Sequence, residues 1–279
     1  MSQQQGAQDY LTELLHRYWF APPVALWRAV ELRTLAQVRL EPPLLDLGCG
    51  DGLVAEVLFG AGAVCAGVDP WPAQLRRASR LGVYRTLALA DGARLPYADS
   101  TFATVLSNSV LEHIPALERV LREVGRVLRP KGRFVFTVPS DAFPRLLAGW
   151  QRAKAAGNLA RADAYLAETD AWLEHHHYHS PAEWHELLAQ SGMTLTTARY
   201  YVPQAVEQLW EAANHRYGLR GGVSPWRLLA APRLRRLGHA GLVRRAVVRT
   251  LGHRWRAAYE ADTSAGEPGG GLLVVAEKP

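Results

Sequence analysis

The stretch from Leu44 to Gly52, Leu-Leu-Asp-Leu-Gly-Cys-Gly-Asp-Gly, constrains the fold more than any other part of the chain. An apolar run ends at Leu47, glycines occupy positions 48, 50 and 52, and a helical pattern begins at Leu53. Glycine adopts backbone conformations that other residues avoid and leaves the backbone amides open to a ligand. A strand, a glycine loop and a helix N-terminus in this order are typical of sites for nucleotide-like molecules.

The spacing of the glycines helps to distinguish a dinucleotide-binding loop from other nucleotide-binding loops. Dinucleotide-binding loops favour G-x-G-x-x-G, in which the third glycine comes about five residues after the first. Here Gly52 comes four residues after Gly48. Asp46 lies inside the motif, where its carboxylate can accept from a cationic amine. A second predicted strand leads to Asp69, which follows Gly48 by 21 residues, the distance at which an acidic residue binds the hydroxyls of a ribose.

Three later segments extend this pattern. They are Ala-Asp-Gly-Ala-Arg-Leu-Pro at 90–96, Ser-Asn-Ser-Val-Leu-Glu-His at 107–113 and Leu-Arg-Pro-Lys-Gly-Arg at 128–133. With the glycine loop and Asp69, they make residues 44–140 resemble the class I S-adenosylmethionine-dependent methyltransferases of the type 11 group, which includes the ubiquinone and menaquinone methyltransferases. The resemblance implies S-adenosyl-L-methionine as cofactor. It also implies methyl transfer to a small-molecule or lipid-linked acceptor.

The same resemblance assigns roles to the residues at the ends of the strands. The amides around the glycine loop would contact the methionine part of the cofactor, and Asp46 its amino group. Asp69 would bind the ribose, Asp91 would reach the edge of the adenine, and Asn108 would lie beside the sulfonium. The full set of predicted cofactor-binding residues is Tyr18, Asp46, Gly48, Cys49, Gly50, Asp69, Pro70, Asp91, Gly92, Asn108 and Ser109.

Tyr18 belongs to this set because N-terminal helices close over the cofactor in the family. Apolar residues recur at helical spacing up to Tyr18 and Trp19, and a second helix is predicted from Pro23 to Gln37. Either aromatic side chain can touch the cofactor. The alternative is that both pack in a contact between the two helices, which such spacing commonly indicates.

The catalytic residues are chosen by position. Methyl transfer from a sulfonium depends mainly on aligning donor and acceptor, so the carboxylates are expected to hold the cofactor. His113 follows the fourth strand, where family members face the substrate, and can remove a proton from an acceptor hydroxyl. Alternatively, it bonds only to backbone at a helix start. Tyr178 and His179 are predicted to contact substrate from the histidine tract at 175–179.

The histidine tract also raises the question of a metal. His175 and His179 are four residues apart and would share a face if the tract were helical. No acidic residue lies within the tract, and such tracts are often on the surface. We therefore predict no metal site.

Short apolar runs and helical patterns alternate through the chain. Strands are predicted at 44–47, 63–68, 86–89, 102–107, 132–138, 194–202 and 271–277, and helices at 53–61, 72–81 and 116–128. Another helix begins at Ser180 with the capping box Ser-Pro-Ala-Glu. This alternation predicts an α/β fold with a doubly wound sheet. The resemblance adds a Rossmann-like sheet of seven strands, mixed because the last strand is antiparallel.

The chain is interpreted as one methyltransferase domain, 1–279, whose core carries additions. The core covers about 38–140, 180–202 and 270–279, and N-terminal helices precede it at 8–37. A helical insertion is predicted at 141–179 and a basic helical insertion at 203–268. We expect the two insertions to form a cap. The second separates two strands that form a hairpin in the family.

The composition bears on where in the cell the protein is expected to be. Cys49 and Cys65 are expected to be free thiols in a reducing compartment. No apolar run is long enough for a transmembrane helix, and residues 1–8 lack the apolar segment of a signal peptide. We expect a cytoplasmic protein. The net charge of +6 is weak evidence of an anionic partner, because arginine outnumbers lysine 29 to 3, which indicates a compositional bias.

The distribution of charge is more informative. Residues 212–259 hold eleven arginines, three histidines and no lysine or acidic residue, with tryptophan and leucine interleaved. Such a segment suits peripheral contact with an anionic membrane or a lipid-linked substrate. The arginines from 233 to 249 fall on nearly all sides of a helical wheel, which weakens the membrane interpretation. The alternative is an ordinary solvated cap.

Three other functions remain open. A nicotinamide-dependent oxidoreductase is disfavoured by the glycine spacing, and a non-catalytic cofactor-binding partner protein by the three intact aspartates. Nucleic acid would use the same basic charges. However, residues 107–110 are Ser-Asn-Ser-Val rather than the Asn-Pro-Pro-Tyr or Asp-Pro-Pro-Tyr of methyltransferases that modify base amines. A nucleic-acid substrate is therefore disfavoured, and oxygen or carbon is the expected target atom.

Overall fold

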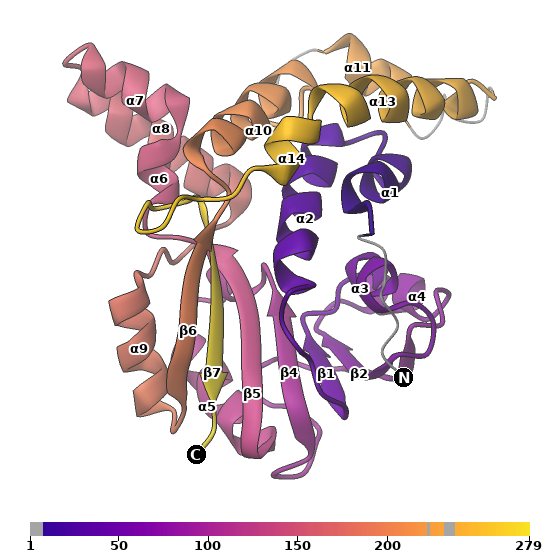
Figure 1. Ribbon diagram of the computed structural model, residues 1–279, viewed down its shortest axis with the longest axis vertical. Coiled ribbons are helices and arrows are strands. Elements are labelled where there is room, and N and C mark those ends of the chain that lie inside the picture. The colour runs from indigo at the N-terminus through magenta and orange to yellow at the C-terminus, as the bar shows by residue number, and fades with distance from the viewer. Residues whose placement is uncertain (1–7, 222–223, 232–237) are drawn as a thin grey trace.

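The computed structural model describes residues 8–221, 224–231 and 238–279. Within these residues a seven-stranded sheet runs in the order β3-β2-β1-β4-β5-β7-β6, and β7 is antiparallel to both of its neighbours (Figure 1). The strands are β1 (Leu44–Leu47), β2 (Val64–Asp69), β3 (Tyr84–Leu89), β4 (Phe102–Asn108), β5 (Leu128–Pro139), β6 (Thr194–Tyr201) and β7 (Gly271–Glu277). This order confirms the predicted mixed, doubly wound sheet.

Helices cover both faces of the sheet, and each face has its own core. Along β1, Leu44 belongs to one buried cluster, whereas Leu45 and Leu47 belong to the other. Side chains alternate in this way because successive residues of a strand point to opposite faces. The helices of the core are α3 (Leu53–Phe59), α4 (Pro72–Ala78), the short 3-10 helix η1 (Leu111–His113), α5 (Leu117–Val127) and α9 (Pro181–Gln190).

The capping box at the start of α9 is confirmed. The Ser180 hydroxyl accepts from the Glu183 amide at 3.3 Å, and the Glu183 carboxylate accepts from the Ser180 amide at 2.7 Å. Several other boundaries differ from the prediction. Helix α4 ends at Ala78 instead of 81, β3 begins at Tyr84 instead of 86, and β5 begins at Leu128 instead of 132. The chain is already extended at Leu128 (ψ 138°), so α5 passes directly into β5.

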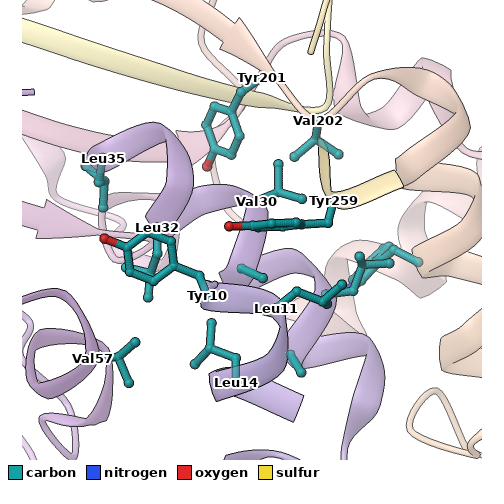
Figure 2. Close-up of a cluster of buried hydrophobic side chains, with 14 of the residues drawn as sticks. Tyr10, Leu11, Leu14, Val30, Leu32, Leu35, Val57, Tyr201, Val202 and Tyr259 are labelled. Carbon is teal, nitrogen blue, oxygen red and sulfur yellow. The ribbon is translucent and has the colours of Figure 1, made fainter. Parts of the chain in front are cut away.

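The N-terminal helices, α1 (Tyr10–Arg17) and α2 (Pro22–Leu35), join the sheet to the rest of the molecule. Figure 2 shows Leu11 and Leu14 of α1 and Val30 of α2 in one cluster with Tyr201, at the end of β6, and Tyr259. All five side chains are buried. The cluster is continuous with the sheet face that carries Leu44, so these helices are part of the core.

The two insertions form helices that lie together beyond one end of the sheet (Figure 1). The first contains α6 (Phe143–Leu146), α7 (Ala148–Ala155) and α8 (Leu159–Leu173). The second contains α10 (Gln204–Arg216), α11 (Pro225–Leu229), α13 (Ala240–Arg254) and α14 (Arg256–Glu260). Arg233, Arg235 and Arg236 of the basic insertion, and residues 1–7, lie outside the described residues. No helix in the described part of the chain has the length and apolar character needed to cross a bilayer.

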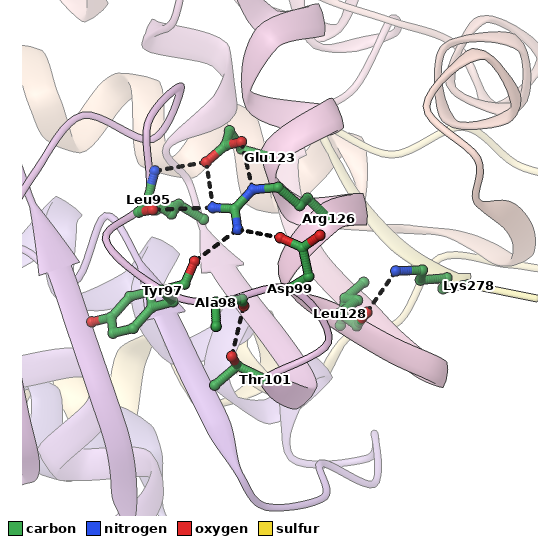
Figure 3. Close-up of polar contacts among 9 residues, drawn as sticks. All are labelled: Leu95, Tyr97, Ala98, Asp99, Thr101, Glu123, Arg126, Leu128 and Lys278. Atoms are coloured by element: carbon green, nitrogen blue, oxygen red, sulfur yellow. Dashed lines mark hydrogen bonds and ion pairs between the residues drawn. The ribbon is translucent and has the colours of Figure 1, made fainter.

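Arg126 of α5 stabilises the loop that follows β3. Its guanidinium donates to the Leu95 and Tyr97 carbonyls and to the carboxylates of Asp99 and Glu123, at 2.7–3.1 Å (Figure 3). This loop begins with Asp91 and Gly92. One half-exposed side chain therefore fixes a segment predicted to contact the cofactor.

We expect Arg126→Ala to lower the free energy of unfolding by about 1–2 kcal/mol, since it removes several charge-assisted hydrogen bonds that solvent partly screens. Urea denaturation measures this change. The matched control is Arg122→Ala, at an exposed arginine one turn earlier on the same helix, which should change stability by less than about 0.5 kcal/mol. Equal stability of the two variants would contradict the role of Arg126.

Candidate functional site

The glycine loop after β1 is held in a conformation that glycine permits. Gly48, Gly50 and Gly52 have φ of 75°, 54° and 79°, in the left-handed region. A Cβ atom at Gly48 would lie 2.5 Å from Val110, whereas one at Gly50 would meet nothing within 4 Å. Gly48 therefore allows close packing of the loop, and Gly50 faces open space.

Two buried carboxylates flank this loop. Asp46 accepts from the Tyr84 hydroxyl at 2.6 Å, and burial raises the pKa of Asp46 to about 6. Asp69 accepts from the amides of Gly50 and Trp71, each at 2.9 Å, and so ties the loop to the end of β2. A buried carboxylate that has a phenol as partner is suited to an added ammonium group, because a charged donor stabilises the ionised form.

The predicted cofactor residues line two adjoining cavities. The first, the glycine-loop cavity, is lined by Tyr18, Asp46, Gly48, Cys49, Gly50, Asn108 and Ser109, among others. The second, the Asp69 cavity, is lined by Asp69, Pro70, Asp91 and Gly92, among others. Gly48 and Val110 line both. The structure thus brings the whole predicted set together, and the two cavities fit the two halves of an extended nucleoside cofactor.

Details of the second cavity suit a flat ring. The Asp91 carboxylate accepts from the Ala93 amide at 2.9 Å, which shapes the turn after β3. A Cβ at Gly92 would approach Leu47 to 3.3 Å, so a larger residue would push into β1. Trp71 lines the same cavity and is 68% exposed, which is unusual for tryptophan. The sequence analysis missed Trp71, although its place two residues after Asp69 was a usable signal.

The two N-terminal aromatic residues have different environments. Tyr18 lines the glycine-loop cavity, and burial raises the pKa of its hydroxyl. Trp19 is buried in the core, with its ring 6.4 Å from that of Trp226. Of the two candidates, only Tyr18 lies at the predicted cofactor position.

A third cavity, the apolar cavity, lies beside the first two. It shares Arg28 and Ser109 with the glycine-loop cavity, and His113 with the Asp69 cavity. Its lining comprises Val24, Trp27, Arg28, Ser109, Glu112, His113, Pro139, Phe143, Leu173, His175 and Trp210. The sequence analysis missed most of these residues, because they come from segments far apart in the chain.

A buried carboxylate on α2 organises the junction of these cavities. Glu31 is fully buried, and one of its oxygens accepts from the hydroxyls of Ser109, Thr137 and Tyr201 at 2.6–3.0 Å. Its other oxygen pairs with Arg28 at 2.5 Å. Burial alone would raise the pKa of Glu31, but the arginine and the hydroxyl donors outweigh it and hold the pKa below its ordinary value. The sequence analysis missed this network, although two opposite charges on a mostly apolar helix were a signal.

Glu112 and His113 lie where the apolar cavity meets the Asp69 cavity. His113 Nδ1 is 3.0 Å from the Glu174 carbonyl oxygen, so Nδ1 carries the proton and Nε2 of the neutral ring keeps its lone pair. Glu112 is 3% exposed, and burial raises its pKa to about 8. His113 bonds to a backbone carbonyl, as one alternative expects, and it also lines two cavities, as its role toward the substrate would require.

The histidine tract is not helical, so His175 and His179 do not share a helical face. The Tyr178 hydroxyl donates to Asp170 at 2.6 Å, and its ring stacks on Phe143 at 5.7 Å. Tyr178 thus supports the apolar cavity from behind. His179 packs against Trp184, 5.2 Å between ring centres, and lines none of the three cavities described above. The structure does not bring His179 to the site.

Comparisons with known proteins match the part of the chain that carries the glycine loop. A family model for a methyltransferase domain matches residues 45–136. The demethylmenaquinone methyltransferase of Corynebacterium urealyticum is 36% identical over 110 residues, which cover 39% of this chain and 46% of that protein. The malonyl-[acyl-carrier protein] O-methyltransferase of Pseudescherichia vulneris is 33% identical over 109 residues, 39% of this chain and 43% of that protein. The chain spans less than half the length of these two curated relatives.

Solved structures extend the likeness of fold to most of the chain. A methyltransferase from Thermotoga maritima, described as a possible histamine N-methyltransferase, covers 96% of this chain and 100% of its own, with a TM-score of 0.55 at 13% identity. A methyltransferase from Mesorhizobium loti covers 90% of this chain and 99% of its own, with a TM-score of 0.52 at 22% identity. The sheet order is that of the Rossmann-like methyltransferase fold. The matched residues, 45–136, are a methyltransferase domain of the class I S-adenosylmethionine-dependent type.

We expect the affinity for S-adenosylhomocysteine to fall roughly tenfold between about pH 7.5 and pH 5, because protonation of Asp46 removes the partner of the ligand's ammonium group. The sign follows from the raised pKa: Asp46 is ionised above about pH 6 and neutral below it. Calorimetric titration at both pH values measures the effect.

The control for this measurement is Asp46→Asn. The variant should bind more weakly at the higher pH and lose most of the pH dependence. An unaltered protein with equal affinity at both pH values would show that Asp46 does not meet the amino group.

Proposed function

We propose that this protein transfers a methyl group from S-adenosylmethionine to an oxygen or carbon atom of a small or lipid-linked acceptor in the apolar cavity. The observation that carries this proposal is the shared lining of the three cavities. Arg28, Ser109 and His113 each border both a predicted cofactor cavity and the apolar cavity. A donor in the first two cavities would therefore meet an acceptor in the third.

The residues of the site align the reactants. When bound, the cofactor supplies a methyl group on a cationic sulfur that leaves as a neutral thioether. Asp46, Asp69 and the glycine loop border the space for the donor, and rigid alignment of the two reactants contributes about 7–11 kcal/mol in favourable cases. Ser109 stands at the junction, fixed by its bond to Glu31 at 2.6 Å. Where the acceptor is a hydroxyl, the free Nε2 of His113 can take its proton.

The lining of the apolar cavity suits an acceptor with an aromatic or aliphatic body. Trp27, Phe143 and Trp210 form an aromatic group with ring centres 5.2–5.9 Å apart. Apolar walls with a few convergent polar groups are typical of small-molecule sites. The named relatives act on demethylmenaquinone, on a malonyl-carrier protein and, in one Caenorhabditis elegans case, on sterols. Their acceptors support a small or lipid-linked acceptor here.

We expect calorimetry to show micromolar binding of S-adenosylhomocysteine and no binding of NADH. Asp69→Asn should weaken this binding at least tenfold, since a hydrogen bond to a charged group is worth about 1.5–3 kcal/mol. The matched control is Asp163→Asn, at an exposed aspartate of α8, which should bind normally. Transfer of labelled methyl to lipid extracts then identifies acceptors.

Each alternative function predicts a different result. Binding of NADH alone would support an oxidoreductase. Binding of S-adenosylhomocysteine with no acceptor methylated in any extract would support a non-catalytic partner protein. Binding of neither ligand would overturn the cofactor site.

We also propose that the basic insertion contacts an anionic membrane surface from the outer side of α13. Leu242, Arg245 and Arg249 follow one another at helical spacing and are exposed, whereas Val247 and Leu251 are buried. Helix α13 therefore has a distinct basic outer face within the described residues. Figure 1 shows α13 at the edge of the molecule farthest from the lower end of the sheet.

We expect the double variant of Arg245 and Arg249 to glutamine to bind phosphatidylserine vesicles at least tenfold more weakly, at about 1 kcal/mol per arginine. Vesicle co-sedimentation at moderate salt measures this binding. The control replaces Arg76, Arg77 and Arg80, exposed arginines in and just after α4, and should bind normally. Failure of the unaltered protein to sediment with the vesicles would refute the proposal.

A further inference from the structure

Three side chains that line the apolar cavity lie close enough to share one ion. Glu112 and His113 belong to η1, His175 follows α8, and one donor atom from each lies within 4.8 Å of the others. Two imidazoles and one carboxylate are the ligand set of many catalytic zinc sites and of non-haem iron sites. We propose that Glu112, His113 and His175 bind a divalent transition-metal ion in the wall of this cavity.

Each imidazole is already oriented by a hydrogen bond to its other nitrogen. His113 donates from Nδ1 to the Glu174 carbonyl oxygen at 3.0 Å. The Tyr178 hydroxyl donates to Asp170, so it accepts from His175 Nδ1, which lies 3.0 Å away. In both rings Nε2 is then the atom with the lone pair. Partners of this kind are usual behind metal-bound histidines, where they fix the tautomer and the ring orientation.

Glu112 supplies the acidic ligand that the histidine tract lacks. Its side chain is 3% exposed, and its Oε2 has no hydrogen-bond partner within the described residues. An unpartnered buried carboxylate is costly, and a bound cation would satisfy it. The nearby Arg28 does not take this role, because its guanidinium is paired with Glu31 at 2.5 Å.

The geometry requires only small side-chain adjustments. His113 Nε2 is 3.9 Å from Glu112 Oε1. Donor atoms around one zinc ion lie roughly 3–3.5 Å apart, because each bond is about 2 Å long. Rotations that move these atoms by about 1 Å would complete the site. Three protein ligands leave coordination positions open, and since all three side chains line the cavity, the open positions face the acceptor.

The ion would act on an acceptor that carries a hydroxyl. A metal-bound hydroxyl has a lowered pKa, so its O–H bond breaks and the proton passes to solvent. The oxygen then attacks the methyl carbon as the carbon–sulfur bond breaks. His113 is a ligand in this arrangement and no longer the base. This consequence rests on the proposed function, whereas binding of the ion does not.

The other histidines of the tract have different partners. His177 Nε2 lies 2.8 Å from the Ile114 carbonyl oxygen, and His179 packs on Trp184. His176 is exposed. Metal binding by the tract alone therefore differs from binding by the proposed site in one respect: it does not depend on Glu112.

The test is a titration of the chelator-treated protein with Co²⁺ alone, followed by its visible absorption, and with Zn²⁺ by calorimetry. We expect one ion per chain and saturation in the micromolar range. Glu112→Gln and His175→Ala should each weaken binding at least tenfold, while His176→Ala should bind as the unaltered protein does. Circular dichroism checks that the variants are folded.

Two results would overturn the inference. The first is an unaltered protein without saturable binding, and the second is a Glu112→Gln variant that binds as tightly as the parent. Binding of S-adenosylhomocysteine is measured on the same samples. A protein that binds the ion at this site but not S-adenosylhomocysteine would refute the proposed function and leave the metal site standing.

Discussion

The carboxylate of Glu31 is the interaction on which the arrangement of the site depends. It lies fully buried on α2 and is bonded to Ser109 after β4, Thr137 on β5 and Tyr201 on β6. Burying one charge is costly unless it is paired and hydrogen-bonded, and the network with Arg28 meets both conditions. As a result α2 is fixed across three strands, and the helix that borders two cavities cannot shift without breaking these bonds.

With α2 fixed in this way, the charged side chains around the site lie on two different sides of Ser109. Asp46 and Asp69 stand at the ends of β1 and β2, on the side of the glycine loop, where a cationic donor needs them. Glu112 lies on the other side of Ser109, in the wall of the apolar cavity. Because Arg28 is paired with Glu31, its charge is largely neutralised at the junction. In the proposed reaction, the polar groups of the two sides would therefore act on different reactants.

The parts of the site that could be predicted from the sequence are those set by local spacing. Asp46, Asp69 and Asp91 follow directly from strand ends and a glycine loop, and the capping box of α9 follows from four consecutive residues. The place of Trp210 and the partners of Glu31 could not be predicted, because they depend on contacts between segments as much as 170 residues apart. The proximity of His175 to Glu112 could not be predicted for the same reason, because Glu112 lies 63 positions earlier in the chain.

The cavities expected to hold the donor and the acceptor also draw on different parts of the chain. The match to the methyltransferase domain covers residues 45–136, which include the glycine loop, Asp69, Asp91 and Asn108. The apolar cavity takes much of its wall from beyond this range: Phe143, Leu173 and His175 come from the first insertion, and Trp210 from the second. The residues that we expect to hold the donor therefore lie within the matched range. Under the proposed function, we expect the choice of acceptor to depend on the shape that α6, α8 and α10 give to the apolar cavity.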